Sequence, residues 1–271
     1  MRESKIPPIL SRKNSREPSV FDPKNLMREA RRQLSIFGGS VPPICLLDPD
    51  GDILKTLKRS GEAHRNESWA CYHTELYDFT LDEIRFGIVG CAVGAPFAVL
   101  IAEQMFVSGC HLVISMTSSG QISPIRKPPY FVLIDKSLRD EGTSYHYLPP
   151  TEYCEISEDL LNTLRNAFSG IPDTIERGAT WTTDAPFRET ETSINFCREK
   201  GILAVEMEAA ALYAFSRARG KPVICFAHVT NQMGNVEGDF EKGAEMGGRN
   251  ALRVIKAAAQ GWLDAFPGEG Y

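Results

Sequence analysis

Short apolar runs alternate along the chain with longer segments in which apolar residues recur at helical spacing. Runs rich in β-branched or bulky apolar residues predict strands at residues 41–47, 83–90, 110–116, 130–135, 202–207 and 222–230. Amphipathic segments predict helices at residues 50–59, 96–109, 157–170, 190–201, 208–220 and 242–266. This alternation is typical of an α/β fold, with a mostly parallel or mixed sheet covered by helices on both faces.

The first forty residues differ from the rest of the chain. Residues 1–20 are rich in proline, serine and basic side chains, which favours a flexible segment. Residues 23–36 then show helical periodicity, and turn-forming residues follow at 37–43. We therefore expect an N-terminal extension over 1–40, partly flexible with one helix, and a single domain over 41–271.

Composition narrows the class of partner. The 271 residues are 42% apolar and 24% charged, and their net charge of −5 argues against a nucleic acid or an anionic membrane as partner. The most apolar stretch, 86–106, is broken by glycine and proline and reaches Glu103 too soon for a membrane span. Without a hydrophobic signal core near the N-terminus, a soluble, cytoplasmic protein is expected.

Metal and nicotinamide sites are not indicated. The seven cysteines are odd in number and form no CxxC pair, so we expect small buried residues in a reducing compartment. The five histidines show no metal-ligand spacing. The glycine-rich stretch 87–96 does not fit GxGxxG, the dinucleotide-binding pattern.

Two acids stand where a predicted strand runs into a predicted helix. Glu206 and Glu208 are spaced i, i+2, so in an extended segment they project to the same side. Acids in a first helical turn also complement the helix dipole without any ligand. However, these acids lie in strongly apolar sequence, with no basic residue at helical spacing before Arg217. A sugar diol supplies two donors for such acids, and Met207 between them suits the apolar face of the ring.

The string Val205–Ala210, VEMEAA, resembles the signature of the purine nucleoside phosphorylase / uridine phosphorylase family, which also includes methylthioadenosine and AMP nucleosidases. Five further segments resemble parts of that family: 46–57, 87–105, 114–120, 178–187 and 223–232. The resemblance runs from about residue 41 to the C-terminal helix. It implies a three-layer α/β/α sandwich with a central mixed, partly barrel-like sheet.

The resemblance implies a sugar site around the acid pair. Glu208 is expected to accept hydrogen bonds from the 2′ and 3′ hydroxyls, Met207 to line the sugar, and Glu206 to shape the same wall. Both acids count as catalytic in this interpretation, because carboxylates beside the sugar favour an oxocarbenium-like transition state over the neutral substrate.

The resemblance also implies a phosphate site formed by Gly51, Lys55, Thr117 and Ser118. Lys55 stands where relatives usually carry an arginine, and lysine lacks the bidentate fork. Ser115 stands where phosphorolytic relatives place a second arginine. Hydrolytic members of the family lack these arginines and activate water, so hydrolysis is an alternative to phosphorolysis. Asp50 and Asp52 are acids that could position the water.

Base-binding residues are less clearly marked. Trp181 is equally compatible with stacking on a base and with a core position. Asn231 follows the last predicted strand, where purine-cleaving relatives carry an aspartate, and Arg188 is the nearest guanidinium to the base-site segment. Neither pattern assigns the base.

These observations predict a nucleoside phosphorylase that yields a free base and (deoxy)ribose 1-phosphate. Phosphate is the co-substrate, and neither a metal nor an organic cofactor is expected. The resemblance implies a homodimer or a homohexamer built as a trimer of dimers. The alternatives are a hydrolytic nucleosidase and a non-catalytic nucleoside-binding protein. The base, the form of the sugar and the role of residues 1–40 stay open.

Overall fold

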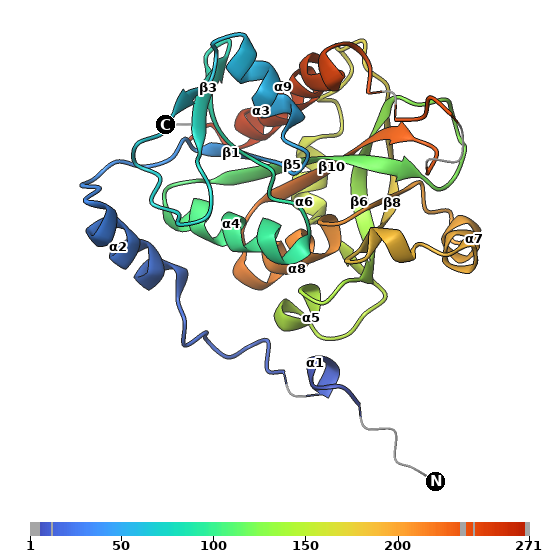
Figure 1. Cartoon of the computed structure of the whole chain (residues 1–271), viewed down its shortest axis with the longest axis horizontal. Coiled ribbons are helices and arrows are strands. Elements are labelled where there is room, and N and C mark those ends of the chain that lie inside the picture. The colour runs from blue at the N-terminus through green and yellow to red at the C-terminus, as the bar shows by residue number, and fades with distance from the viewer. Residues whose placement is uncertain (1–5, 12, 234–236, 241, 269–271) are drawn as a thin grey trace.

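A computed structural model describes residues 6–11, 13–233, 237–240 and 242–268 (Figure 1). Its strands are β1 Ile44–Asp48, β2 His64–Arg65, β3 Tyr77–Leu81, β4 Ile84–Gly90, β5 Leu112–Gln121, β6 Tyr130–Asp140, β7 Tyr153–Glu155, β8 Ile175–Thr183, β9 Ala204–Glu206 and β10 Val223–Asn231. The helices are α1 Pro8–Ser11, α2 Pro23–Leu34, α3 Asp52–Arg59, α4 Ala95–Val107, α5 Ser144–Tyr147, α6 Glu158–Thr163, α7 Glu191–Glu199, α8 Ala209–Arg219 and α9 Gly248–Ala265. Two 3₁₀ turns, η1 Pro186–Arg188 and η2 Ala244–Gly247, complete the described elements.

One mixed sheet organises the molecule, and part of it closes into a ring. Its strand order is β10-β6-β8-β9-β5-β1-β4-β3-β2, with β7 paired to β6. Strand β10 also pairs with β5, which closes β5, β9, β8, β6 and β10 into a five-stranded barrel-like unit. Both parallel and antiparallel pairs occur in it, so the predicted mixed, partly barrel-like sheet is confirmed.

Helices cover both faces of this sheet, as the alternation of the sequence predicts. Figure 1 shows α3 and α9 on one side of the sheet and α4 and α8 on the other. In α8, every residue from Ala209 to Phe215 is buried, because small alanines let this helix lie close to the strands. The three-layer arrangement is therefore confirmed.

The sequence also leaves β2, β3, β7 and α5 unpredicted, and three further departures from the element predictions have a physical reason. Strand β8 is not among the predicted strands, because buried threonines replace the apolar residues that mark its neighbours. The helix predicted over 157–170 ends at Thr163, since Asn166, Ser169 and Gly170 favour turns. The helix predicted over 242–266 begins only at Gly248, after Gly247 adopts a φ of +73°, a left-handed conformation that glycine accepts at little steric cost.

The N-terminal extension lies against the α4 face of the domain. Helix α2 packs on α4, and Lys13 Nζ lies 2.8 Å from His146 Nδ1 beside α5. The predicted single helix is α2, and the structure adds the four-residue α1. Across the described residues, no helix combines the length and apolar character that a membrane crossing requires.

Candidate active site

Glu206 and Glu208 lie at the junction between β9 and α8. Strand β9 pairs with β8 through Thr182–Glu206 and with β5 through Gly120–Val205, so three strands converge on the acids. Both side chains are buried, Glu206 at 3% exposure and Glu208 at 1%. Two carboxylates in so apolar an environment require specific donors, and the structure supplies a different set to each.

Glu206 is saturated with hydrogen-bond donors. Five groups lie between 2.6 and 3.1 Å from its carboxylate oxygens: the hydroxyls of Ser137, Thr180 and Thr182, and the backbone N–H groups of Glu208 and Ala209. Its Oε2 accepts both N–H groups at the start of α8, where the helix dipole favours a negative charge. Glu206 therefore joins β8, β9 and α8, and ligand hydroxyls find little acceptor capacity on it.

Glu208 has fewer partners and lies beside another helix start. Its Oε1 accepts the Gly94 N–H at 2.7 Å, the Thr117 hydroxyl hydrogen-bonds the carboxyl group, and Met207 N lies 3.3 Å from Oε2. Gly94 has a φ of +88°, which favours glycine where α4 begins. Of the two acids, Glu208 is the better placed to exchange a partner for a sugar hydroxyl. Met207 between them is half-buried.

Burial and the neighbouring Glu206 charge raise the pKa of Glu208 from 4.5 to about 8. Burial also raises the pKa of Glu206, against the opposing effect of its donors. Near neutral pH, the unliganded pair therefore carries fewer than two negative charges, because the second ionisation places two carboxylates in one buried site.

This raised pKa predicts a pH-dependent stability difference between the wild type and Glu208→Gln. Between pH 4.5 and about 8, folded Glu208 holds a proton that the unfolded chain releases, so rising pH favours unfolding through this group. Glutamine does not titrate. The melting temperature of Glu208→Gln relative to wild type should therefore increase by roughly 5–10 °C from about pH 5.5 to about pH 8.5. Thermal unfolding at both pH values measures it, and a constant difference would contradict the assignment.

The predicted phosphate residues divide into two pairs. Thr117 and Ser118 on β5 line a small cavity of about 20 Å³. Gly51 and Lys55 are not among the residues that line it. The Gly51 N–H donates to Asp48 O, while the Lys55 side chain is 65% exposed and lies 3.4 Å from Asp52.

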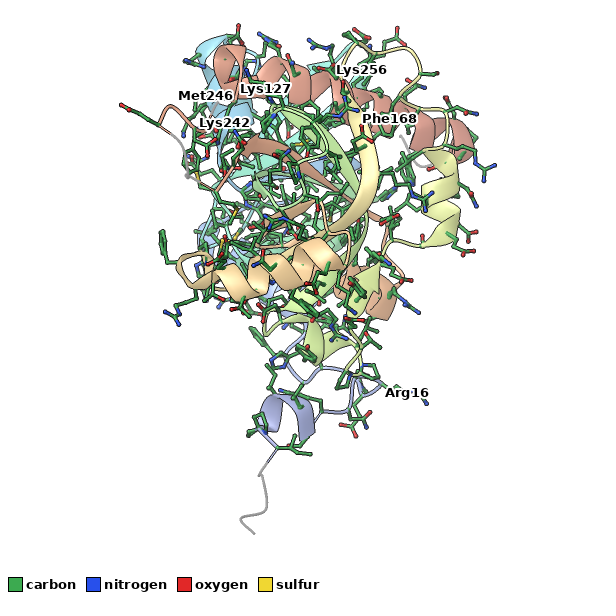
Figure 2. All side chains as sticks on the ribbon, turned by 90° about the vertical axis from the view of Figure 1, so that its right-hand side faces the viewer. Arg16, Lys127, Phe168, Lys242, Met246 and Lys256 are labelled. Carbon is green, nitrogen blue, oxygen red and sulfur yellow. The ribbon has the colours of Figure 1, made fainter. Side chains whose placement is uncertain are left out.

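A cation that the sequence did not reveal lines the same cavity. Lys242, labelled with Met246 in Figure 2, comes from the segment before α9, and its side chain is 14% exposed. Its Nζ lies 2.6 Å from Asp52 Oδ2 and 3.5 Å from Asp50 Oδ1. Lys242 belongs to none of the segments that resemble the family, and no motif marks it, so only the folded chain shows its place.

The neighbouring His228 adds no positive charge to this cavity. Burial lowers the pKa of His228 to about 4, and its ring stacks on Phe131 with 4.4 Å between centroids. His228 lies within the apolar strand β10 and is buried. Across the described residues, no group of three or more His, Cys, Asp or Glu side chains is arranged to hold a metal ion.

The predicted base residues are not all brought together. Asn231 lies at the end of β10 beside Gly120, which pairs through β5 with the strand that carries the acids. Trp181 is 3% exposed and donates its Nε1–H to Asp140, so the structure favours its core alternative over stacking. Arg188 is exposed at the end of η1.

Met233 is a further residue near the base position that the sequence did not single out. Its N–H donates to Asn231 Oδ1, and its sulfur covers Gly120 so closely that an added Cβ there would collide with it. A thioether beside an amide suits a flat heterocycle, so Asn231 and Met233 together are the better candidates for base contacts.

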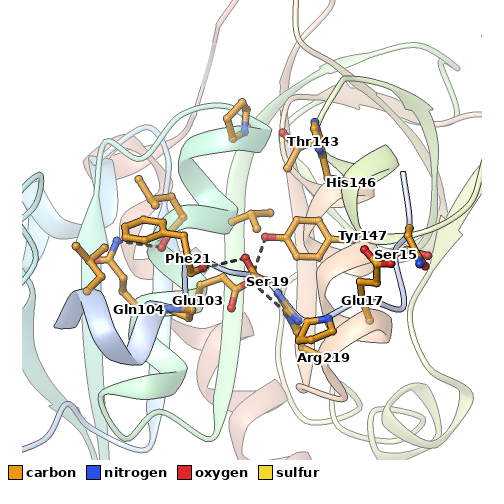
Figure 3. A pocket seen from close by; sticks show the side chains of 18 residues that line it. Ser15, Glu17, Ser19, Phe21, Glu103, Gln104, Thr143, His146, Tyr147 and Arg219 are labelled. Carbon is orange, nitrogen blue, oxygen red and sulfur yellow. Dashed lines mark hydrogen bonds and ion pairs between the residues drawn. The ribbon is translucent and has the colours of Figure 1, made fainter. Parts of the chain in front are cut away.

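A larger cavity lies apart from the acids. It has a volume of about 630 Å³, opens to solvent and is lined by the N-terminal extension, α4, α5 and α8 (Figure 3). Tyr147 donates to Glu103 inside it, and Arg219 lies 3.4 Å from the same carboxylate. None of the predicted site residues lines this cavity, so it is distinct from the candidate active site.

Comparison with known proteins gives this geometry a family. The family model described as "Phosphorylase superfamily" matches residues 43–260. A guanosine phosphorylase of Halorubrum lacusprofundi is 25% identical over 172 residues, covering 63% of this chain and 70% of the relative.

Two solved structures share the fold. A uridine phosphorylase of Vibrio fischeri superposes with a TM-score of 0.67 at 19% identity, covering 80% of this chain and 90% of that one. A purine nucleoside phosphorylase of Toxoplasma gondii does so with a TM-score of 0.69 at 15% identity, covering 81% and 90%. The match over 43–260 contains every strand of the sheet and both buried acids, so the chain belongs to the Phosphorylase superfamily.

Proposed function

We propose that this protein cleaves the N-glycosidic bond of a nucleoside, with phosphate as the nucleophile. The observation that carries the proposal is Glu208: a buried acid at the start of α8 with one firm backbone donor, beside a saturated partner acid. When ionised, its oxygens suit the two hydroxyls of a ribose diol. The same charge stabilises a ribosyl cation more than a neutral nucleoside, which is the difference that catalysis needs.

Other residues around Glu208 support this role. Met207, half-buried between the acids, offers an apolar contact for the sugar ring, and Asn231 and Met233 lie beside Gly120 at the end of β5, where they would contact the base. Glu206 acts as a positioning residue, because its contacts fix the start of α8 on which Glu208 stands. A homo-oligomer, expected from the family, is part of the same proposal.

For the nucleophile, hydroxyls and cations support phosphate. Thr117 and Ser118 supply hydroxyl groups, and Lys242 supplies a largely buried positive charge on the same cavity. Ammonium and hydroxyl groups are ordinary phosphate ligands.

Hydrolysis is the second candidate, and one observation favours it. The cavity of about 20 Å³ has room for about one water molecule, and its wall includes the Asp50 carboxylate. Asp50 would position that water as a general base, leaving a free sugar as product.

An assay of base release with and without phosphate distinguishes the two candidates. Guanosine should head a panel of purine and pyrimidine nucleosides, because the Halorubrum relative is named for it. We expect release to fall at least about 100-fold when phosphate is removed, since the nucleophile is then missing. Chromatography should show pentose 1-phosphate as product. Turnover unchanged without phosphate, with free sugar formed, rejects phosphorolysis, and tight nucleoside binding without turnover indicates a binding protein.

A further inference from the structure

The Asp50 carboxylate lies against the backbone of β5 at Ser118, one of the predicted phosphate residues. Asp50 Oδ2 accepts the Ser118 N–H at 2.7 Å, and Oδ1 lies 3.5 Å from Lys242 Nζ. A phosphate oxygen seeks the same two partners, a backbone N–H group and a cation. The chain's own anion therefore occupies the donors that the nucleophile would use.

The surroundings hold this arrangement in place. Lys242 is fixed from the other side by Asp52 at 2.6 Å, and the Ser118 hydroxyl pairs with Thr230 Oγ1 at 2.9 Å. His228, kept neutral by its lowered pKa, offers no compensating charge. The remaining volume of about 20 Å³ is too small for a five-atom phosphate ion but accepts a water molecule.

We propose that Asp50 is an internal competitor of inorganic phosphate for the Ser118 N–H and Lys242, and that it determines which nucleophile the site admits. Phosphate enters when the Asp50 side chain, one third exposed and part of the turn before α3, rotates away from Ser118. A water molecule fits in the cavity while the Asp50 side chain keeps its hydrogen bond with the Ser118 N–H. The inference rests on the proposed function only in taking this cavity as the place of the nucleophile.

Phosphate binding tests the competition directly. Isothermal titration of the full chain with inorganic phosphate, without nucleoside, should give an affinity about 10- to 100-fold higher for Asp50→Ala than for wild type, because one charge-assisted hydrogen bond is released to the ligand. Asp50→Asn removes the charge but keeps an acceptor for Ser118, so its gain should be smaller. Far-UV circular dichroism confirms folding, and Asp50→Asn carries the test if the alanine variant does not fold.

Asp52→Ala is the matched control. Asp52 has the same charge and lies closer to Lys242, but it is Asp50 and not Asp52 that accepts the Ser118 N–H. Its removal should raise phosphate affinity less than Asp50→Ala does, because it releases Lys242 but leaves Asp50 on the Ser118 N–H. Equal gains in Asp50→Ala and Asp52→Ala, or no gain in either Asp50 variant, would overturn the competition.

The nucleoside assay separates this inference from the proposed function. If the protein does not cleave nucleosides but its variants bind phosphate as expected, the competition is supported and nucleoside cleavage is rejected. If the protein cleaves nucleosides but its Asp50 variants bind phosphate no more tightly than wild type, nucleoside cleavage is supported and the competition is rejected. In an active enzyme, Asp50→Ala should lower KM for phosphate while leaving KM for the nucleoside within about 3-fold, since Asp50 contacts neither predicted sugar nor base residues.

Discussion

Replacing Glu208 by glutamine is expected to lower kcat/KM for nucleoside cleavage by about 10²- to 10³-fold, the effect of removing one electrostatic contact to a charge that develops in the transition state. Glutamine is nearly isosteric and keeps an oxygen for the Gly94 N–H, so the start of α4 should keep its geometry. The lost quantity is the negative charge beside the ribosyl cation. Steady-state kinetics with the preferred nucleoside measures it.

Glu141→Gln is the matched control for this variant. Glu141 is also a buried acid whose pKa is raised by burial, and it accepts the N–H of Ser144 at the start of α5. Its hydrogen-bond partner is Ser144 and neither acid of the pair, so its replacement should change kcat/KM by less than about 3-fold. If Glu208→Gln were as active as Glu141→Gln, the sugar-diol assignment of Glu208 would be wrong.

The acid pair can be predicted from the sequence, but the difference between its members, a saturated Glu206 and a Glu208 with fewer donors, cannot. Glu206 and Glu208 attract attention because they are acids in an apolar segment without nearby bases. Which of them is saturated depends on Thr180 and Thr182, and these stand on β8, whose polar pattern hides it from a search for apolar runs. The argument that first-turn acids serve the helix dipole holds for Glu206, while the ligand role is proposed for Glu208 alone.

The phosphate region shows the second limit of sequence reasoning. The family resemblance of residues 114–120 predicts Thr117 and Ser118, and both line the cavity. The contact between Asp50 and Lys242 joins residues 192 positions apart, and neither local pattern nor spacing encodes such a pairing. Fold class, by contrast, follows from apolar periodicity, which is a local property repeated along the whole chain.

Glu206→Ala should produce the largest loss of stability among the variants considered, about 3–5 kcal/mol. Removing this carboxylate leaves two backbone N–H groups at the start of α8 without their side-chain acceptor and takes one acceptor from three hydroxyls on β6 and β8, inside a site from which solvent is excluded. Chemical denaturation followed by circular dichroism at about pH 6 measures the loss.

Glu208→Ala at the same pH distinguishes the effect of the donor set from the effect of burial. The Glu208 carboxyl group is equally buried, but it is protonated at this pH and has fewer donors. We expect this variant to lose less than about half as much stability as Glu206→Ala. Similar losses in the two variants would mean that burial alone, and not the five-donor set, makes Glu206 structural. A small loss of stability in Glu206→Ala would indicate that the five donors do not depend on Glu206. Its oxygens would then be available to a ligand, and both acids would again be candidates for binding the sugar hydroxyls.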